Sequence, residues 1–215
     1  VLSGDVPLLD NETLSALLSE HRAAHAAATL LSAQLGNPTG YGRVIRDTDG
    51  GVARIVEQKD ASAEELTVTE VNAGVYVFRA AALRAHIGGL TTDNAQGEMY
   101  LTDMVALLRG AGESVAARTI SDSSLVEGVN DRVQLAAAAA RLNARVIRHW
   151  QLAGVTVQDP ATTWIDVTAT LAPDVTLLPG TQILRATVIG AGATIGPDTT
   201  LSDCEVGEGA TIRRS

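Results

Sequence analysis

The 215-residue sequence is poor in several residue types, and each shortage excludes a class of protein. Its one cysteine, Cys204, cannot form an internal disulfide, so a disulfide-built secreted scaffold is excluded. Only 3% of the residues are aromatic, which disfavours an aromatic-rich β-sandwich core and a platform for base stacking. No apolar run approaches the ~18 residues that a membrane span requires. We therefore expect a soluble, cytoplasmic protein without a membrane partner.

Positive charge is also scarce. The chain has 16 Lys and Arg residues against 25 Asp and Glu, a net charge of −9, and Lys59 is its single lysine. A protein that grips nucleic acid needs clustered positive charge facing phosphate, so we expect no nucleic-acid partner. His21 and His25 have the i, i+4 spacing of a metal-chelating pair, but no third ligand accompanies them. We therefore expect both histidines to lie on the surface or to pack in the core, and not to bind a metal.

Residues 1–130 alternate helical and strand-like patterns. A capping signal at 10–12 precedes apolar residues at helical spacing, and residues 80–86 and 103–108 are expected to be short helices. The sequence Asp-Thr-Asp-Gly-Gly at 47–51 predicts a hairpin, and the acidic stretch 60–70 is expected to be a surface loop. Strands are expected at 29–34, 44–45, 52–56, 71–78 and 115–120. Strands alternating with helices indicate an α/β architecture.

A long helix and a short repeat follow. The pair Asn130-Asp131 is a capping signal, and the alanine-rich segment after it predicts a linker helix over 131–152. Large aliphatic residues then recur with a period of six, and after a one-residue slip the register resumes at Val206 and Ile212. The seven anchors are Ile165, Leu171, Leu177, Ile183, Ile189, Ile195 and Leu201. This period is typical of a parallel β-helix, in which each hexapeptide forms one flat side of a triangular coil.

Polar and glycine-rich loops are the candidate sites for chemistry. Asp5 is placed at the carboxyl end of a strand, the edge where α/β sheets bind ligands. A carboxylate that faces substrate phosphates there suits Mg²⁺, which takes one or two hard oxygen donors and leaves its other positions to phosphate and water. The glycines of segment 38–43 would let backbone N–H groups approach a ligand. Asn72 lies just inside a strand, and 94–103 is a polar loop that leads into a helix.

Six motifs, in this order, resemble one family of enzymes. They are Gly-Asp-Val-Pro-Leu at 4–8, Pro-Thr-Gly-Tyr-Gly-Arg at 38–43, Ile-Val-Glu-Gln-Lys-Asp-Ala at 55–61, Glu-Val-Asn-Ala-Gly at 70–74, Asn-Ala-Gln-Gly-Glu-Met-Tyr-Leu-Thr-Asp at 94–103 and Gly-Val-Asn-Asp-Arg at 128–132. With the helix and the repeat, the chain resembles the bifunctional bacterial N-acetylglucosamine-1-phosphate uridyltransferase / glucosamine-1-phosphate acetyltransferases over essentially its whole length.

This resemblance implies a fold and an organisation. Residues 1–130 would be the C-terminal part of a Rossmann-like uridyltransferase (pyrophosphorylase) domain. Residues 131–152 would be the linker helix, and 153–215 the start of a left-handed parallel β-helix that belongs to an acetyltransferase domain. The intact protein would form a homotrimer through this β-helix.

The resemblance also implies roles for single residues. The implied catalytic and metal-binding residues are Asp5 and Asn130, which would hold Mg²⁺. The implied substrate-binding residues are Ser3, Gly4, Asp5, Gly42, Glu57, Asn72, Glu98, Tyr100 and Asn130. Of these, Ser3 and Gly4 would lie against the nucleotide. Gly42, Glu57 and Asn72 would bind the UDP-sugar. Glu98 and Tyr100 would contact its N-acetylglucosamine.

The implied reaction is Mg²⁺-dependent transfer of a uridylyl group from UTP to N-acetylglucosamine 1-phosphate, giving UDP-N-acetylglucosamine and pyrophosphate. A phosphate monoester is already a nucleophile at neutral pH, so alignment and charge neutralisation suffice and no protein base is required. This agrees with the sequence, in which no activated nucleophile or base was found. The intact protein would also acetylate glucosamine 1-phosphate, with acetyl-CoA as co-substrate.

Two further expectations concern what this chain does by itself. It begins at Val1 without a methionine and ends inside a repeat, so we expect a fragment that lacks the basic nucleotide loop and the acetyltransferase active site and is inactive alone. Two other functions stay open. One is a different sugar-1-phosphate nucleotidyltransferase with a β-helical tail, such as an adenylyl- or thymidylyltransferase, and the other is a non-catalytic trimerisation scaffold.

Overall fold

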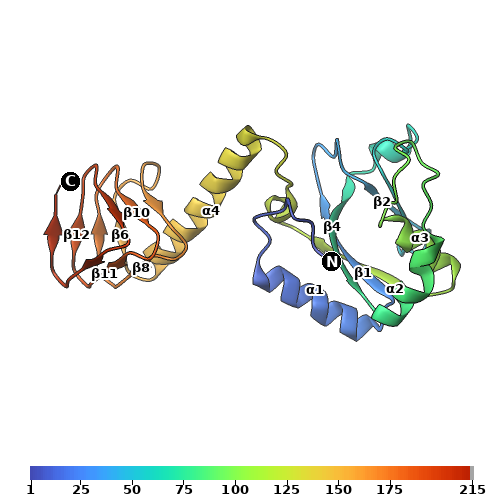
Figure 1. Ribbon diagram of the computed structural model, residues 1–215, viewed down its shortest axis with the longest axis horizontal. Coiled ribbons are helices and arrows are strands. Elements are labelled where there is room, and N and C mark those ends of the chain that lie inside the picture. The colour runs from blue at the N-terminus through green and yellow to red at the C-terminus, as the bar shows by residue number, and fades with distance from the viewer. Residues whose placement is uncertain (214–215) are drawn as a thin grey trace. The chain divides into compact units, whose positions relative to one another are not determined.

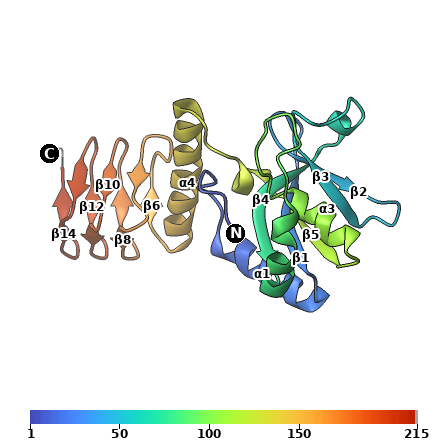
Figure 2. The same cartoon turned by 45° about the vertical axis from the view of Figure 1, so that its right-hand side comes forward.

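The computed structural model describes residues 1–213, which form two compact units. The first unit is Val1–Asn130, and the second begins at Asp131. Figures 1 and 2 show a mixed sheet with helices in the first unit and a coil of short strands in the second. Within the described residues, no helix combines the length and the hydropathy that a bilayer span needs.

The first unit is built on a five-stranded sheet with the strand order β3-β2-β4-β1-β5. Neighbouring strands are antiparallel except β1 and β5, which are parallel. The strands are β1 (Ala28–Gln34), β2 (Arg43–Arg46), β3 (Val52–Val56), β4 (Glu70–Phe78) and β5 (Val115–Ile120). The helices are α1 (Asn11–Ala24), α2 (Ala80–His86) and α3 (Asp103–Gly110), with 3-10 turns η1 (Glu65–Thr67), η2 (Ile87–Gly89) and η3 (Ser123–Val126). The predicted α/β architecture and the hairpin between β2 and β3 are confirmed.

Each face of this sheet has its own apolar core, with α1 on one side and α3 on the other (Figure 1). Leu31 of β1 packs in the same core as Leu17 of α1, whereas Leu30 packs in the core that contains Met104 and Leu108 of α3. Adjacent strand residues point to opposite faces, so one strand contributes to both cores.

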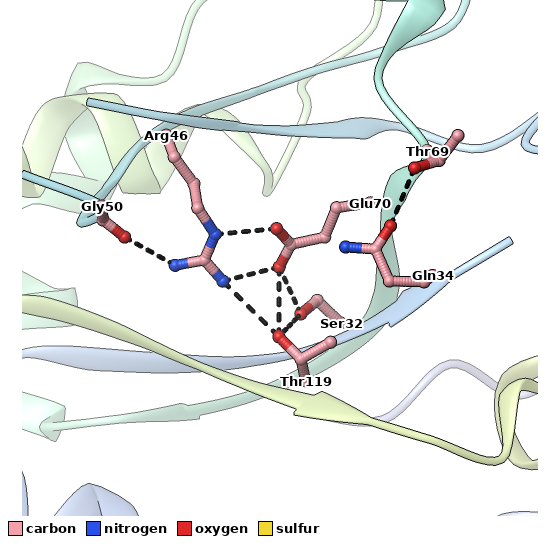
Figure 3. Close-up of polar contacts among 7 residues, drawn as sticks. All are labelled: Ser32, Gln34, Arg46, Gly50, Thr69, Glu70 and Thr119. Atoms are coloured by element: carbon pink, nitrogen blue, oxygen red, sulfur yellow. Dashed lines mark hydrogen bonds and ion pairs between the residues drawn. The ribbon is translucent and has the colours of Figure 1, made fainter. Parts of the chain in front are cut away.

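The expected surface loop over 60–70 is wrong at its end, because Glu70 is buried and begins β4. Its carboxylate accepts hydrogen bonds from Ser32 Oγ (2.7 Å), from Arg46 Nε (2.7 Å) and from Arg46 Nη2 (2.7 Å) (Figure 3). Thr119 Oγ1 donates a further bond of 3.3 Å. These partners lie on β1, β2 and β5, so one carboxylate joins four of the five strands.

The Glu70 carboxylate stays charged in this setting. Burial alone would raise the pKa of Glu70, but the hydrogen bonds from Arg46 and Ser32 and the positive charge of Arg46 outweigh it, and the pKa is lowered. Glu70, which the sequence pattern places at the end of a loop, is therefore a structural anchor of the sheet.

The second unit is a parallel β-helix preceded by α4 (Arg132–Leu152). Its short strands stack into three parallel sheets with the orders β6-β9-β12-β15, β7-β10-β13 and β8-β11-β14. The strands are β6 (Thr156–Val157), β7 (Trp164–Ile165), β8 (Thr170–Leu171), β9 (Thr176–Leu177), β10 (Gln182–Leu184), β11 (Val188–Ile189), β12 (Thr194–Ile195), β13 (Thr200–Ser202), β14 (Glu205–Val206) and β15 (Thr211–Ile212). This architecture is consistent with the predicted left-handed β-helix.

The stacking register explains the period of six. Ile165 pairs with Ile183, which pairs with Leu201, so each step along a sheet spans three hexapeptides. On the other two sheets the last step is one residue shorter, ending at Val206 and Ile212, as the slip in the repeat predicts. The anchors are buried and fill the inside of the coil.

Helix α4 closes the first coil of this unit. Asp131 caps the helix by accepting from Gln134 N–H (2.7 Å), and Ile147 packs in the β-helix core. The buried Asn143 donates to the Thr163 carbonyl (2.8 Å) and accepts from Ile165 N–H (3.1 Å), which satisfies backbone groups at the open end of the first coil. Hence α4 belongs structurally to the β-helix unit.

Replacement of Glu70 by Gln leaves Arg46 without its negative partner. We expect the free energy of unfolding at pH 7 to fall by about 2 kcal/mol, less than for a fully buried pair because Arg46 is partly exposed. The pKa of Glu70 is lower in the folded than in the unfolded chain. The stabilisation is therefore complete above the unfolded value of ~4.3 and is lost as the pH falls through the folded value. Urea unfolding across this pH range measures both effects.

The matched control is Glu113→Gln, which breaks the partly exposed ion pair between Glu113 and Arg79. Exposed pairs contribute little, so we expect a loss below ~1 kcal/mol. Equal losses for the two variants would show that the buried carboxylate is not an anchor of the sheet.

Candidate functional site

A pocket of about 330 Å³ opens in the first unit beside β4. Asn72, Gly74 and Tyr76 alternate along this strand and therefore face the same side of the sheet. The remaining walls come from the first three residues, from the end of β3 and from the loop before α3. The lining residues are Val1, Leu2, Ser3, Glu57, Asn72, Gly74, Tyr76, Met99, Tyr100, Leu101 and Thr102.

Ser3 lies directly over Gly74. A methyl group at Gly74 would lie 2.3 Å from Ser3 Oγ, which is far inside contact distance, and the φ angle of +69° there also favours glycine. Ser3 Oγ donates to the Gly74 carbonyl (3.3 Å), and Tyr76 N–H donates to the Val1 carbonyl (3.0 Å). The first residues thus lie along β4 because residue 74 lacks a side chain.

Glu57 provides the negative charge of the pocket. Thr102 Oγ1 donates to its carboxylate (3.1 Å), and a methyl group at Gly42 would lie 3.2 Å from each carboxylate oxygen. Burial raises the pKa of Glu57, the hydrogen bond from Thr102 opposes this, and Asp103 and Asp60 add to the rise. No ion pair of Glu57 is formed among the described side chains, so the carboxylate is available to accept hydrogen bonds from a ligand.

The segment 38–43 is held in place by a buried arginine. Arg43 donates to the Tyr41 carbonyl and to Gln58 Oε1 (2.7 Å), and the same Gln58 oxygen accepts from Gly40 N–H (3.2 Å). The Gly42 carbonyl accepts from Asn72 N–H (2.9 Å), which joins the segment to β4. These bonds fix the glycine that faces the Glu57 carboxylate.

The loop 94–102 forms the outer wall and is clasped to the turn after β3. Lys59 Nζ donates to Gln96 Oε1 (2.6 Å), and Ala95 N–H donates to Asp60 Oδ1 (2.7 Å). Gln96 Nε2 in turn donates to the Tyr100 hydroxyl (2.7 Å). The clasp places the Tyr100 ring at the pocket.

Asp5 and Asn130 meet beside Gly128. A methyl group at Gly128 would lie 3.1 Å from Asp5 Oδ2 and 3.8 Å from Asn130 Nδ2, so both side chains lie close to one point. Val129 N–H donates to the Asp5 carbonyl (2.8 Å), and Gly128 N–H donates to the Tyr41 hydroxyl (3.3 Å). Both side chains are exposed. The pair therefore lies on the surface. Asp5 is two residues along the chain from Ser3, which lines the pocket.

The donor set of this pair fits a hard divalent cation. One carboxylate and one amide oxygen leave most positions of an octahedral Mg²⁺ to phosphate and water. Within residues 1–213, no three His, Cys, Asp or Glu side chains gather closely enough to hold a metal by themselves. A metal at Asp5 and Asn130 would accordingly depend on oxygen atoms of a bound substrate.

The structure brings most of the sequence-predicted residues together. Ser3, Glu57, Asn72 and Tyr100 line the pocket, Gly42 abuts Glu57, and Asp5 lies with Asn130. Gly4 is exposed in the turn between the two groups.

Glu98 lies apart from these residues. It is exposed and is not among the pocket-lining residues, and its backbone N–H donates to Asn94 Oδ1 (3.2 Å). In this arrangement Glu98 shapes the outer loop.

Sequence reasoning missed Thr102 and Tyr76. Thr102 stands just before the helix that the sequence predicts from residue 103, and its contact with Glu57 spans 45 residues. Tyr76 stands in an apolar strand pattern, which indicates core and gives no signal of a pocket. Such contacts depend on how the sheet and the loops come together, so no local pattern could have found them.

The comparisons with known proteins come from sequence and from structure. Residues 1–169 match the family model described as nucleotidyl transferase. The chain is 64% identical over 215 residues to the bifunctional protein GlmU of Clavibacter sepedonicus and 57% identical to that of Mycolicibacterium vanbaalenii. Each alignment covers 100% of this chain and 44% of the relative, so the chain spans less than half the length of these curated relatives. The expected resemblance to a bifunctional enzyme is confirmed.

Among solved structures, the chain is similar to a putative glucose-1-phosphate thymidylyltransferase from Bacillus anthracis. The alignment covers 66% of this chain and 52% of the other, with a TM-score of 0.46 and 20% identity. This similarity is too low to support any conclusion about the function of the chain.

Replacement of Gly74 by Ala tests the close approach of Ser3. We expect loss of stability from two sources, the positive φ angle and the clash with Ser3 Oγ. Gly97→Ala is the matched control, because Gly97 has a φ of +67° and nothing within 4 Å of an added methyl group. The first variant should lose at least ~1 kcal/mol more than the second in urea unfolding. Equal losses would show that Ser3 Oγ does not crowd residue 74.

Proposed function

Because this chain belongs to the nucleotidyl transferase family, we propose that the longer protein to which it belongs transfers a uridylyl group from UTP to N-acetylglucosamine 1-phosphate. The products would be UDP-N-acetylglucosamine and pyrophosphate, formed in the cytoplasm. The observation that carries this proposal is the pocket around Glu57 and Asn72 beside the pair Asp5 and Asn130. A pocket that accepts and donates hydrogen bonds next to a metal-binding pair suits a sugar joined to phosphates.

The chemistry requires alignment more than an activated side chain. An oxygen of the sugar phosphate would form a bond to the α-phosphorus of UTP while the bond to the β-phosphate oxygen breaks and pyrophosphate leaves with that electron pair. Asn72 and the carboxylate of Glu57 would hold the sugar, and Ser3 would lie against the nucleotide. A bound Mg²⁺ would neutralise developing negative charge. Asp5 and Asn130 would hold this ion.

The relatives' name supports a second activity in the longer protein. We propose that it acetylates glucosamine 1-phosphate, with acetyl-CoA as co-substrate, and that the β-helix joins three copies. The stacked coils support the assembly proposal, because flat parallel faces can pack against equivalent faces of another copy. A sedimentation experiment that finds only monomers would contradict it.

Substitution of Asp5 by Asn tests the metal pair. In the presence of Mg²⁺ we expect UDP-N-acetylglucosamine to bind about 10-fold more weakly to Asp5→Asn than to the unchanged chain, because the metal no longer bridges the protein and the phosphates. Without Mg²⁺ the Asp5→Asn chain should bind no more weakly than the unchanged chain, because the substitution removes a negative charge that repels the phosphates. Asp49→Asn, an exposed carboxylate in the β2–β3 hairpin, is the control and should change neither value. An Asp5 effect that is independent of Mg²⁺ would argue against a metal site.

We also expect the 215-residue chain by itself to bind UDP-N-acetylglucosamine more weakly than micromolar, and to be inactive. Residues 1–130 carry nine Lys and Arg against seventeen Asp and Glu, and such a field opposes the binding of phosphates. A titration followed by NMR, with Mg²⁺ present, measures the affinity. A micromolar dissociation constant would refute this expectation.

A further inference from the structure

The hydroxyl of Tyr76 is buried without a partner. Tyr76 is 4% exposed, and its ring stacks on Phe78 with centroids 5.5 Å apart. No hydrogen bond of ordinary geometry joins the hydroxyl to the described residues, although the Asn72 side chain lies near enough to interact with it. A buried polar group without a partner is unfavourable, and a phenylalanine would fill the same apolar space without that penalty. The hydroxyl therefore keeps hydrogen-bonding capacity for a partner from outside the chain.

The surroundings of this hydroxyl show where such a partner would come from. Tyr76 lines the same pocket as Asn72 and Glu57, and it lies on the Asn72 side of β4. Burial raises the pKa of Tyr76 well above its ordinary value, the polar interaction with the Asn72 side chain opposes this rise, and the negative charge of Glu57 adds to it. The phenol is therefore neutral at physiological pH and can donate a hydrogen bond as well as accept one.

We propose that Tyr76 is a ligand-binding residue whose hydroxyl forms a hydrogen bond with a hydroxyl or carbonyl oxygen of the sugar in this pocket. This inference rests on the proposed function. It adds a polar contact from a third residue to the contacts proposed for Asn72 and Glu57. A ligand in the pocket supplies the partner that the protein does not.

The substitution Tyr76→Phe separates this role from a structural one. It removes one oxygen and keeps the ring against Phe78. We expect the dissociation constant for UDP-N-acetylglucosamine, measured by NMR titration of the 215-residue chain, to rise about 3- to 10-fold. The midpoint of urea unfolding without ligand should stay the same or rise. A lower midpoint together with unchanged affinity would overturn the proposal.

Tyr41→Phe calibrates the stability measurement. The Tyr41 hydroxyl accepts a hydrogen bond from Gly128 N–H, so its removal should lower the unfolding midpoint. The two Tyr-to-Phe variants are then expected to differ in the sign of their effect on stability. The chain has three tyrosines, so ¹³Cζ labelling also allows the Tyr76 signal to be followed directly, and it should shift on ligand addition. An unshifted signal at saturation would contradict the contact.

The choice of ligands distinguishes failure of this inference from failure of the proposed function. UDP-N-acetylglucosamine, UDP-glucose and dTDP-glucose are titrated in parallel. If only another sugar nucleotide binds and Tyr76→Phe weakens it, the proposed substrate is wrong while the contact stands. If UDP-N-acetylglucosamine binds equally to both chains, the substrate stands and the contact is overturned. If none of the three shifts any pocket signal, both are overturned.

Discussion

Two glycines let the first residues of the chain lie against the rest of the first unit. Ser3 lies where a side chain at Gly74 would be, and Asp5 lies 3.1 Å from where one at Gly128 would begin. Through these contacts a single short segment joins the pocket on β4 to the pair formed by Asp5 and Asn130. An added methyl group would force Ser3 to move at Gly74, where the contact would be 2.3 Å, whereas at Gly128 the Asp5 carboxylate would have to shift only slightly. The approach of the first residues to β4 therefore depends most on the absence of a side chain at residue 74.

Two glutamates illustrate how surroundings decide what a carboxylate does: the buried Glu70 of β4 and the half-buried Glu57, which directly follows β3. The pKa of Glu70 is lowered because the bonds from Arg46 and Ser32 outweigh its burial, and this residue joins four strands. The pKa of Glu57 is raised because burial is opposed mainly by one hydroxyl, that of Thr102. Glu70 has its hydrogen-bonding capacity filled within the protein and is structural. Glu57 keeps capacity for a ligand, which is why we propose that it binds the sugar.

Much of the fold could be predicted from the sequence because the relevant signals are local. The period of six and its slip before Val206 depend only on which residues point into the coil, and they fix the stacking of the β-helix. The capping of α4 by Asp131 and the β2–β3 hairpin are equally local. Glu70 was expected in a surface loop because an acidic residue is usually exposed unless a basic residue pairs with it. The residue that pairs with Glu70 is Arg46, 24 residues away, so the sequence pattern around Glu70 gives no sign of it.

The candidate site could be predicted in part, but from a family resemblance and not from local sequence signals. Asp5, Asn72 and Asn130 were found through motifs that resemble a family, and the structure then shows that Asp5 lies beside Asn130. Tyr76 carries no such motif, and its strand pattern is that of a core residue. Only the arrangement of the pocket reveals that this residue borders a space where a ligand could bind.

The most direct test of this account is a paramagnetic titration of the ¹⁵N-labelled 215-residue chain with Mn²⁺ in place of Mg²⁺, in the presence of UDP-N-acetylglucosamine, whose phosphate oxygens would complete the site. If Asp5 and Asn130 form one metal-binding pair, the amide signals of residues 4–6 and 128–130 should broaden first, at the lowest metal concentrations. Broadening that begins elsewhere, or that spreads evenly over the acidic surface, would contradict the joint site and the function built on it.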